Sequence, residues 1–113
     1  MPSGGADGDE PRTLPMKTRW MPLPEQDLES AYEYVRQDNS KAASRLLARV
    51  FEAVEMLGRY PSAGHPGRVP ATRELSIAHT PYIVVYRHIR DEIHILAVIH
   101  GARRWPMTVG EGG

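Results

Sequence analysis

The chain is short and electrically balanced, with 113 residues, 14 basic and 14 acidic side chains, and no cysteine. The lack of cysteine excludes a disulfide framework and a thiolate site, and the zero net charge argues against nonspecific nucleic-acid binding through a large positive surface. No segment approaches the roughly 20 consecutive apolar residues of a membrane-spanning helix, so we expect a cytoplasmic protein with no membrane association.

The two ends of the chain differ in composition from its middle. Residues 1–15 are rich in glycine, proline and acidic residues and lack an apolar period, which predicts a disordered N-terminal extension. We expect a single domain over residues 16–107 and a flexible tail over residues 108–113.

The first half of the domain is predicted to form a short extended run followed by two helices. Residues 17–20 are extended, and Pro22 and Pro24 then favour the first turn of a helix that ends near residue 38. The turn at residues 38–40 begins a second helix, which runs to Leu57 with Gly58 as a left-handed cap. Apolar residues at helical spacing, Phe51 among them, predict the buried stripe of this second helix.

The second half is predicted to form strands. Residues 60–70 contain three prolines and two glycines, which indicates an irregular connection without an element. Period-two patterns then predict strands over 72–77, 82–88 and 93–100, with residues 90–92 as a hairpin loop. The fold class is therefore α+β, in the order β-α-α-β-β-β, with the helical hairpin packed on one face of a small, mostly antiparallel sheet.

The last strand has apolar residues on both of its predicted faces. Simple alternation places one set (Ile93, Ile95, Ala97, Ile99) on one face and the other (His94, Leu96, Val98, His100) on the opposite face. Such a strand is either central in its sheet or has a second face that a partner covers.

A cluster of polar and aromatic residues follows this strand. Residues 58–109 hold seven arginines, no lysine and three acidic residues, whereas residues 24–57 hold four basic and seven acidic residues. Because arginine favours planar, bidentate contacts, we expect His100, Arg103, Arg104 and Trp105 to form one rim that contacts a macromolecule. The alternatives are a solvated rim with the indole packed on the core, and a structural hydrogen-bonding role for His100.

The histidines do not predict a metal centre. His94 and His100 share a predicted face but lie six residues apart, about 20 Å along a strand. His88 and His94 could meet across the hairpin, but two ligands without a third are a poor metal site. We expect no metal and no cofactor.

The element order and three segments resemble the RelE/ParE superfamily of type II toxins, which includes the plasmid-stabilisation toxins. The resemblance covers about residues 16–107 and lies in Arg73-Glu74-Leu75, in the run from Pro81 to Arg87, and in Ile99-His100-Gly101-Ala102-Arg103-Arg104-Trp105-Pro106.

The resemblance implies a growth-inhibiting toxin that a cognate antitoxin neutralises, so that the two form a hetero-oligomer. It implies that the antitoxin's C-terminal segment occupies the same groove or an open sheet edge, adding a strand or a helix. Arg68 and Arg73, which flank the second predicted strand, join the rim residues as candidates for contact with the antitoxin or the target.

Members of the superfamily act either by cutting messenger RNA on the ribosome or by poisoning DNA gyrase. In the ribonucleases we expect a basic residue after the tyrosine of the penultimate strand, where this chain has Ile83, although Arg103 does match a basic position. The sequence therefore favours the ParE-like branch, a gyrase-like target and no catalytic residue. The alternatives are a ribosome-dependent mRNA endoribonuclease that uses His100, Arg103, Arg73 and Arg87, and a non-toxic interaction module.

Overall fold

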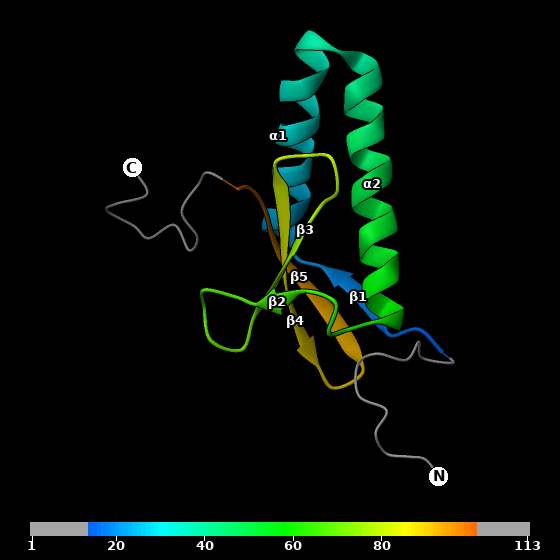
Figure 1. The fold of residues 1–113 in the computed structure, drawn as a ribbon, viewed down its shortest axis with the longest axis vertical. Helices are drawn as coiled ribbons and strands as arrows, with labels where there is room; N and C mark the ends of the chain where they lie inside the picture. The colour runs from blue at the N-terminus through cyan, green and yellow to red at the C-terminus, as the bar shows by residue number, and fades with distance from the viewer. Residues whose placement is uncertain (1–13, 102–113) are drawn as a thin grey trace.

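The computed structural model describes residues 14–101 and shows two helices against a five-stranded sheet (Figure 1). The elements are β1 (Lys17–Trp20), α1 (Pro22–Asp38), α2 (Ser40–Arg59), β2 (His65–Pro66), β3 (Arg73–Ser76), β4 (Tyr82–Ile89) and β5 (Glu92–His100). The strand order is β1-β5-β4-β3-β2, in which only the β1–β5 pair is parallel. The predicted α+β class and the mostly antiparallel sheet are confirmed.

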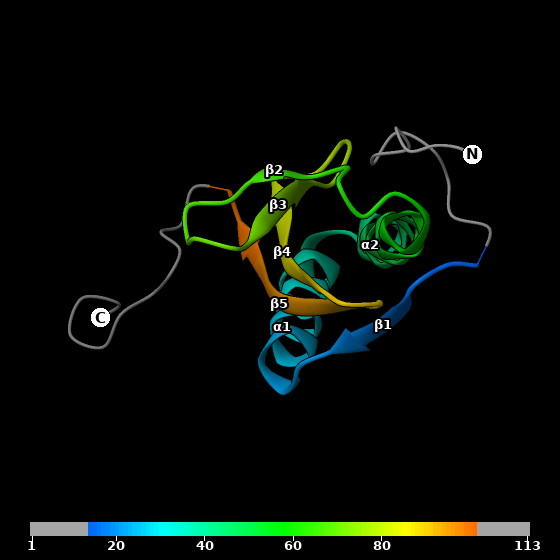
Figure 2. The same ribbon diagram turned by 90° about the horizontal axis from the view of Figure 1, so that it is seen from below.

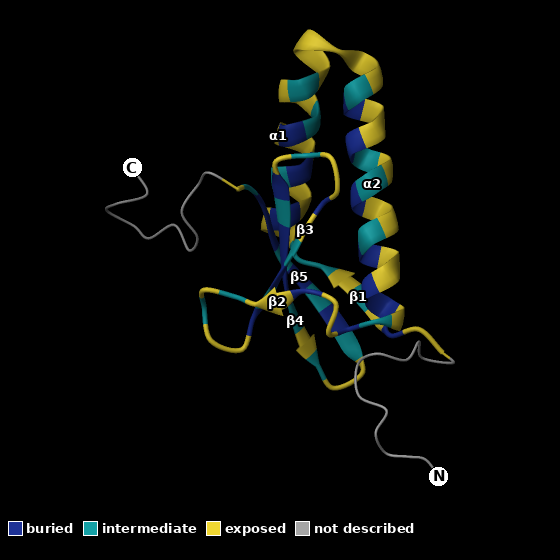
Figure 3. Cartoon of the chain, viewed as in Figure 1, coloured by how far each residue is buried: buried dark blue, intermediate teal, exposed yellow. Residues whose placement is uncertain are grey.

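The main hydrophobic core lies between the helical hairpin and one face of the sheet. Its members come from α1 (Leu28, Ala31), α2 (Leu46, Val50, Val54, Leu57), β4 (Val84, Tyr86) and β5 (Ile93, Ile95). Figure 2, which views the helices nearly end-on, shows α2 beside the strands and α1 next to β5. Figure 3 shows that the outer sides of both helices and the tip of the hairpin are exposed.

The turns around the two helices follow the local sequence signals, with one exception. The Asn39 side chain accepts a hydrogen bond from the Ala42 amide at 3.0 Å, as a helix cap does. The prediction that Gly58 is a left-handed cap is wrong, because α2 continues to Arg59. Gly58 instead permits close approach of the chain before β1: the Met16 amide donates to its carbonyl at 2.8 Å, and a Cβ there would lie 3.1 Å from the Met16 carbonyl oxygen.

The segment 60–70 contains a strand that the sequence does not predict. His65 and Pro66 pair with Glu74 and Arg73 of β3, forming the two-residue edge strand β2. Pro66 is compatible with this position because an edge strand leaves one row of amides without partners in the sheet. Local composition indicates only the turns, whereas the pairing depends on contacts across the fold.

A β-bulge in β5 overturns the predicted alternation of faces. Tyr86 pairs with Ile95 and Val85 pairs with Ala97, so Leu96 is an extra residue in β5. The residues beyond the bulge therefore change sides: Val98 joins the helix-facing core, whereas Ala97 and Ile99 form a second cluster with Val85 on the opposite face. His94 and His100 consequently lie on opposite faces, not on a shared one.

Candidate functional site

The predicted rim is only partly within the described residues. Arg103, Arg104 and Trp105 lie outside them, and His100 ends β5 on the helix-facing side. The His100 ring packs edge-on against Tyr82, with 5.5 Å between ring centroids. His100 also lines a hollow of about 610 Å³ between the end of β5 and α1, together with Asp27, Ser30, Ala31, Tyr34, Tyr82 and Val98.

The three described candidates for RNA cleavage do not converge. Arg73 lies opposite Tyr86 and His100 lies opposite Tyr82. These register partners are four residues apart on β4, which corresponds to about 13 Å. Arg87 alternates with Tyr86 and therefore faces the other side of the sheet. Acid–base cleavage needs its groups within hydrogen-bond reach of one substrate, which these three positions do not provide.

The position expected to be basic in a ribonuclease lies among uncharged residues. Ile83 is flanked across the sheet by Ser76 of β3 and Ile99 of β5, on the face away from the helices. Ile83 and Ile99 pack with Val85 and Ala97 in the second hydrophobic cluster. A phosphate at this position would meet apolar side chains and one serine.

Arg68 and Arg73 contact their own chain. The Arg73 guanidinium donates to the Gly64 carbonyl at 2.6 Å. The Arg68 amide donates to Glu74 Oε2 at 3.1 Å, and its Nε lies 3.4 Å from the same oxygen. The Glu74 side chain belongs to β3 and is only 2% exposed, so the contacts between Arg68 and Glu74 hold the 60–72 segment to the sheet.

Tyr86 holds the same segment from the helix-facing side of the sheet. Its hydroxyl donates to the Pro61 carbonyl at 2.7 Å and accepts from the Gly64 amide at 2.9 Å. Burial raises the pKa of Tyr86, although the Gly64 amide opposes the change, so the hydroxyl remains a donor at neutral pH. The sequence does not reveal this role, because the partners are 22 and 25 residues away.

An exposed groove of about 480 Å³ lies between the helices and β1, and we call it the aromatic groove. It is lined by Trp20, Glu25, Leu28, Glu29, Tyr32, Leu47 and Phe51. The Trp20 and Phe51 ring centroids are 5.9 Å apart. Phe51 is 52% exposed, so the prediction that it belongs to the buried stripe is wrong. Large aromatic groups of this kind are common in protein interfaces.

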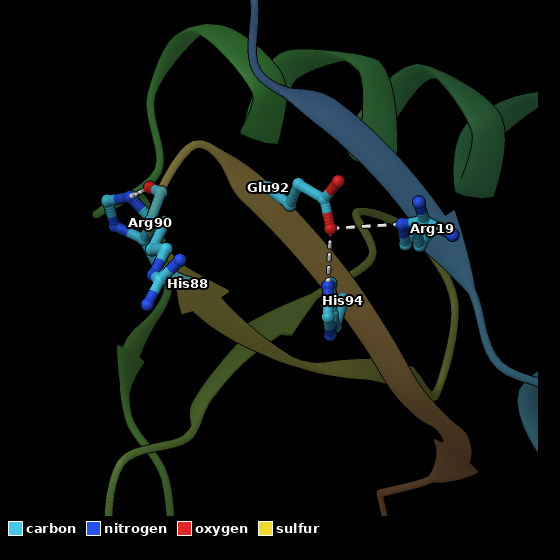
Figure 4. A network of polar contacts seen from close by, with 5 residues as sticks. All are labelled: Arg19, His88, Arg90, Glu92 and His94. Atoms are coloured by element: carbon cyan, nitrogen blue, oxygen red, sulfur yellow. Dashed lines mark hydrogen bonds and ion pairs between the residues drawn. The ribbon is translucent and has the colours of Figure 1, made fainter.

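A polar network lies on the sheet face away from the helices (Figure 4). Glu92 Oε1 accepts from Arg19 Nε at 2.9 Å and lies 2.8 Å from His94 Nε2. The hydrogen bond from His94, assisted by the nearby Arg19 and opposed by partial desolvation, holds the pKa of the Glu92 carboxyl below its ordinary value.

This network predicts a pH-dependent contribution to stability. Because the folded protein lowers the pKa of Glu92, its carboxylate stabilises the fold above the unfolded value of about 4.3 and loses that effect as the pH falls through the folded value. The difference in urea midpoint between the parent chain and Glu92→Gln should therefore be present at pH 7 and shrink below about pH 4. Glu52→Gln, on the exposed side of α2, is the matched charge control, and an equal pH response in both variants would contradict the assignment.

Within residues 14–101, no three histidine, aspartate or glutamate side chains come together as metal ligands. Neither described helix combines the length and apolarity required to cross a bilayer.

Sequence comparisons relate the chain to toxins. The family model described as the ParE toxin of type II toxin–antitoxin systems, parDE, matches residues 18–105. The candidate toxin Y4kP of Sinorhizobium fredii is 40% identical over 93 residues, which cover 82% of this chain and 96% of that protein. Toxin RelE2 of Caulobacter vibrioides is 31% identical over 77 residues, which cover 68% of this chain and 85% of its own length.

Solved structures have the same fold. The chromosomal ParDE toxin–antitoxin system from P. aeruginosa aligns with a TM-score of 0.70 and 25% identity, over 75% of this chain and 95% of that one. The RelBE2 toxin–antitoxin complex from Mycobacterium tuberculosis aligns with a TM-score of 0.60 and 25% identity, over 83% of this chain and 100% of that one.

Proposed function

This chain belongs to the ParE toxin family of type II toxin–antitoxin systems, and on that premise we propose that it stops growth by binding a macromolecular target similar to DNA gyrase. A cognate antitoxin neutralises it in the cytoplasm by forming a hetero-oligomer. No residue of the chain acts as a catalyst in this proposal.

The observation that carries the choice of target is the separation of the candidate catalytic groups. The register partners of Arg73 and His100 are about 13 Å apart along β4, Arg73 and His100 lie on opposite sides of that strand, and Arg87 lies on the other face of the sheet. Ile83 stands in an apolar environment where a ribonuclease would bind phosphate. These features support a toxin that binds its target without cutting RNA.

The aromatic groove is our proposed docking site for the antitoxin. Both structural relatives come from toxin–antitoxin systems, which supports a protein partner for this chain. The exposed ring of Phe51 and the neighbouring Trp20 suit an apolar segment, while Glu25 and Glu29 favour basic residues beside it. Arg68 and Arg73 are less suited to this role because they already contact their own chain.

The second candidate is a ribosome-dependent mRNA endoribonuclease, which similarity to a relative named RelE2 favours. In that case the predicted catalytic groups are His100, Arg103, Arg73 and Arg87, and the described three of them would have to come together on the ribosome. A non-toxic interaction module is the third reading.

Induced expression in bacterial cells separates these functions. We expect filamentation, DNA-damage signalling and a supercoiling defect, with transcripts left intact. Co-expression of the short reading frame next to this one should restore growth. Cleaved transcripts and arrested translation would support the ribonuclease instead, and normal growth with abundant protein would support the inert module.

A further inference from the structure

Arg87 carries a buried nitrogen that has no partner. Among the residues that the structure describes, the Arg87 Nε is the one buried side-chain nitrogen or oxygen atom that lacks a hydrogen-bond partner. The side chain lies on the sheet face away from the helices, opposite His94 on β5. Because buried donors in proteins are normally satisfied, this nitrogen marks Arg87 as a side chain whose hydrogen-bonding capacity its own chain does not fill.

Two carboxylates near Arg87 contact other side chains. Arg19, His94 and Arg87 form one row across β1, β5 and β4. Glu92 Oε1 lies 2.9 Å from Arg19 Nε and 2.8 Å from His94 Nε2. The carboxylate of Glu74, on the same face, forms an ion pair with Arg68. Both of these carboxylates therefore contact side chains other than Arg87.

Arg87 is one of the residues that line an apolar hollow of about 480 Å³, which we call the Arg87 hollow. Its walls are the first turn of α1 with the preceding residue (Met21–Pro24), Val69 and Thr72 before β3, and Leu96 at the bulge. Leu23 is 68% exposed at its rim. Leu96 lies on the same face as Arg87 and His94, and the bulge brings Ala97 to that face as well.

We propose that the Arg87 hollow binds an acidic side chain flanked by apolar residues in a polypeptide partner. The carboxylate accepts from the Arg87 guanidinium, and the flanking side chains pack on Leu23 and Leu96. A charge-assisted hydrogen bond at a partly buried guanidinium favours a carboxylate over an amide. A nucleic-acid backbone fits less well, since successive phosphates need several cations and this hollow offers apolar walls. The Arg87 hollow and the aromatic groove have no lining residue in common. A failure of peptide binding at the hollow would therefore not contradict the proposed function, and a failure of the proposed function would not contradict binding at the hollow.

The test is an NMR titration of the full chain that observes the arginine Nε–Hε signals. The probe is the blocked peptide acetyl-Leu-Glu-Leu-amide, and acetyl-Leu-Gln-Leu-amide is the matched control peptide. The Arg87 signal is assigned as the one missing from Arg87→Lys. We expect it to shift saturably with the Glu peptide and the Gln peptide to bind about tenfold more weakly.

Two further variants keep the test independent of any folding defect in Arg87→Lys. Leu23→Asp changes an exposed residue and places a competing carboxylate at the rim, so it should weaken binding of the Glu peptide by about tenfold. Arg45→Gln, on the exposed side of α2, should leave the titration unchanged.

Three results would overturn the proposal. The first is equal response to the Glu and Gln peptides, or response to neither. The second is binding of 3-methylbutanoate, a small apolar carboxylate, without binding of the peptide, which would assign the hollow to a small molecule. The third is a shift of the Arg87 signal by a short single-stranded oligonucleotide but not by the peptide.

Discussion

Cells that express the Arg103→Ala variant should form colonies almost as well as uninduced cells, whereas expression of the parent chain should reduce colony formation by several orders of magnitude. Arg103 is the basic residue that matches the superfamily after the last strand, and arginine supplies a planar fork of donors that alanine removes. Plating efficiency after induction, with protein levels matched by immunoblot, measures the effect.

The His100→Gln variant distinguishes a binding mechanism from an RNA-cutting mechanism. In a binding mechanism, loss of the imidazole acid–base group should leave toxicity largely intact, because His100 would act only through contacts. In an RNA-cutting mechanism it should remove toxicity as fully as Arg103→Ala does. Full toxicity in both variants would rule out the predicted rim as the active surface.

Replacing Tyr86 by phenylalanine should lower the free energy of unfolding by about 2–3 kcal/mol, because the Gly64 amide and the Pro61 carbonyl lose their buried partner. This is a large fraction of the roughly 5–15 kcal/mol available to a small domain. Urea unfolding followed by circular dichroism gives the value.

Tyr34→Phe is the matched control for the same hydroxyl deletion. Tyr34 is 70% exposed, so its variant should unfold within about 0.5 kcal/mol of the parent. A Tyr86→Phe variant as stable as Tyr34→Phe would mean that the hydroxyl does not hold the 60–72 segment in solution.

The sequence predicts those parts of the fold that depend on neighbouring residues. The prolines at 22 and 24, the Asn39 cap and the polar turn before Glu92 mark element boundaries within a few residues of where they occur. Three predictions are wrong: the left-handed cap at Gly58, the absence of a strand in residues 60–70 and the unbroken alternation of the last strand. Each of these features depends on a strand or loop that is distant in sequence. Periodicity alone cannot locate an inserted residue that reverses the faces of a strand.

The candidate site was harder to predict than the fold. A count of arginines shows that the second half of the chain is basic, but it does not show which guanidinium already has an internal partner. Arg68 and Arg73, predicted to contact a partner, also contact the 60–72 segment or hold it to the sheet within their own chain. Among the described residues, the buried nitrogen without a hydrogen bond belongs to Arg87. Phe51 shows the same limit, since helical spacing placed it in the core and the structure leaves it 52% exposed.

The central claim is that the chain inhibits growth by binding a gyrase-like target and not by cutting RNA. The most direct measurement adds the purified chain to a DNA gyrase supercoiling reaction and, in parallel, to a translation reaction that contains ribosomes and a defined messenger RNA. We predict loss of supercoiling that the antitoxin reverses, with the messenger RNA intact. Unaffected supercoiling together with messenger RNA cleaved on the ribosome would contradict the claim.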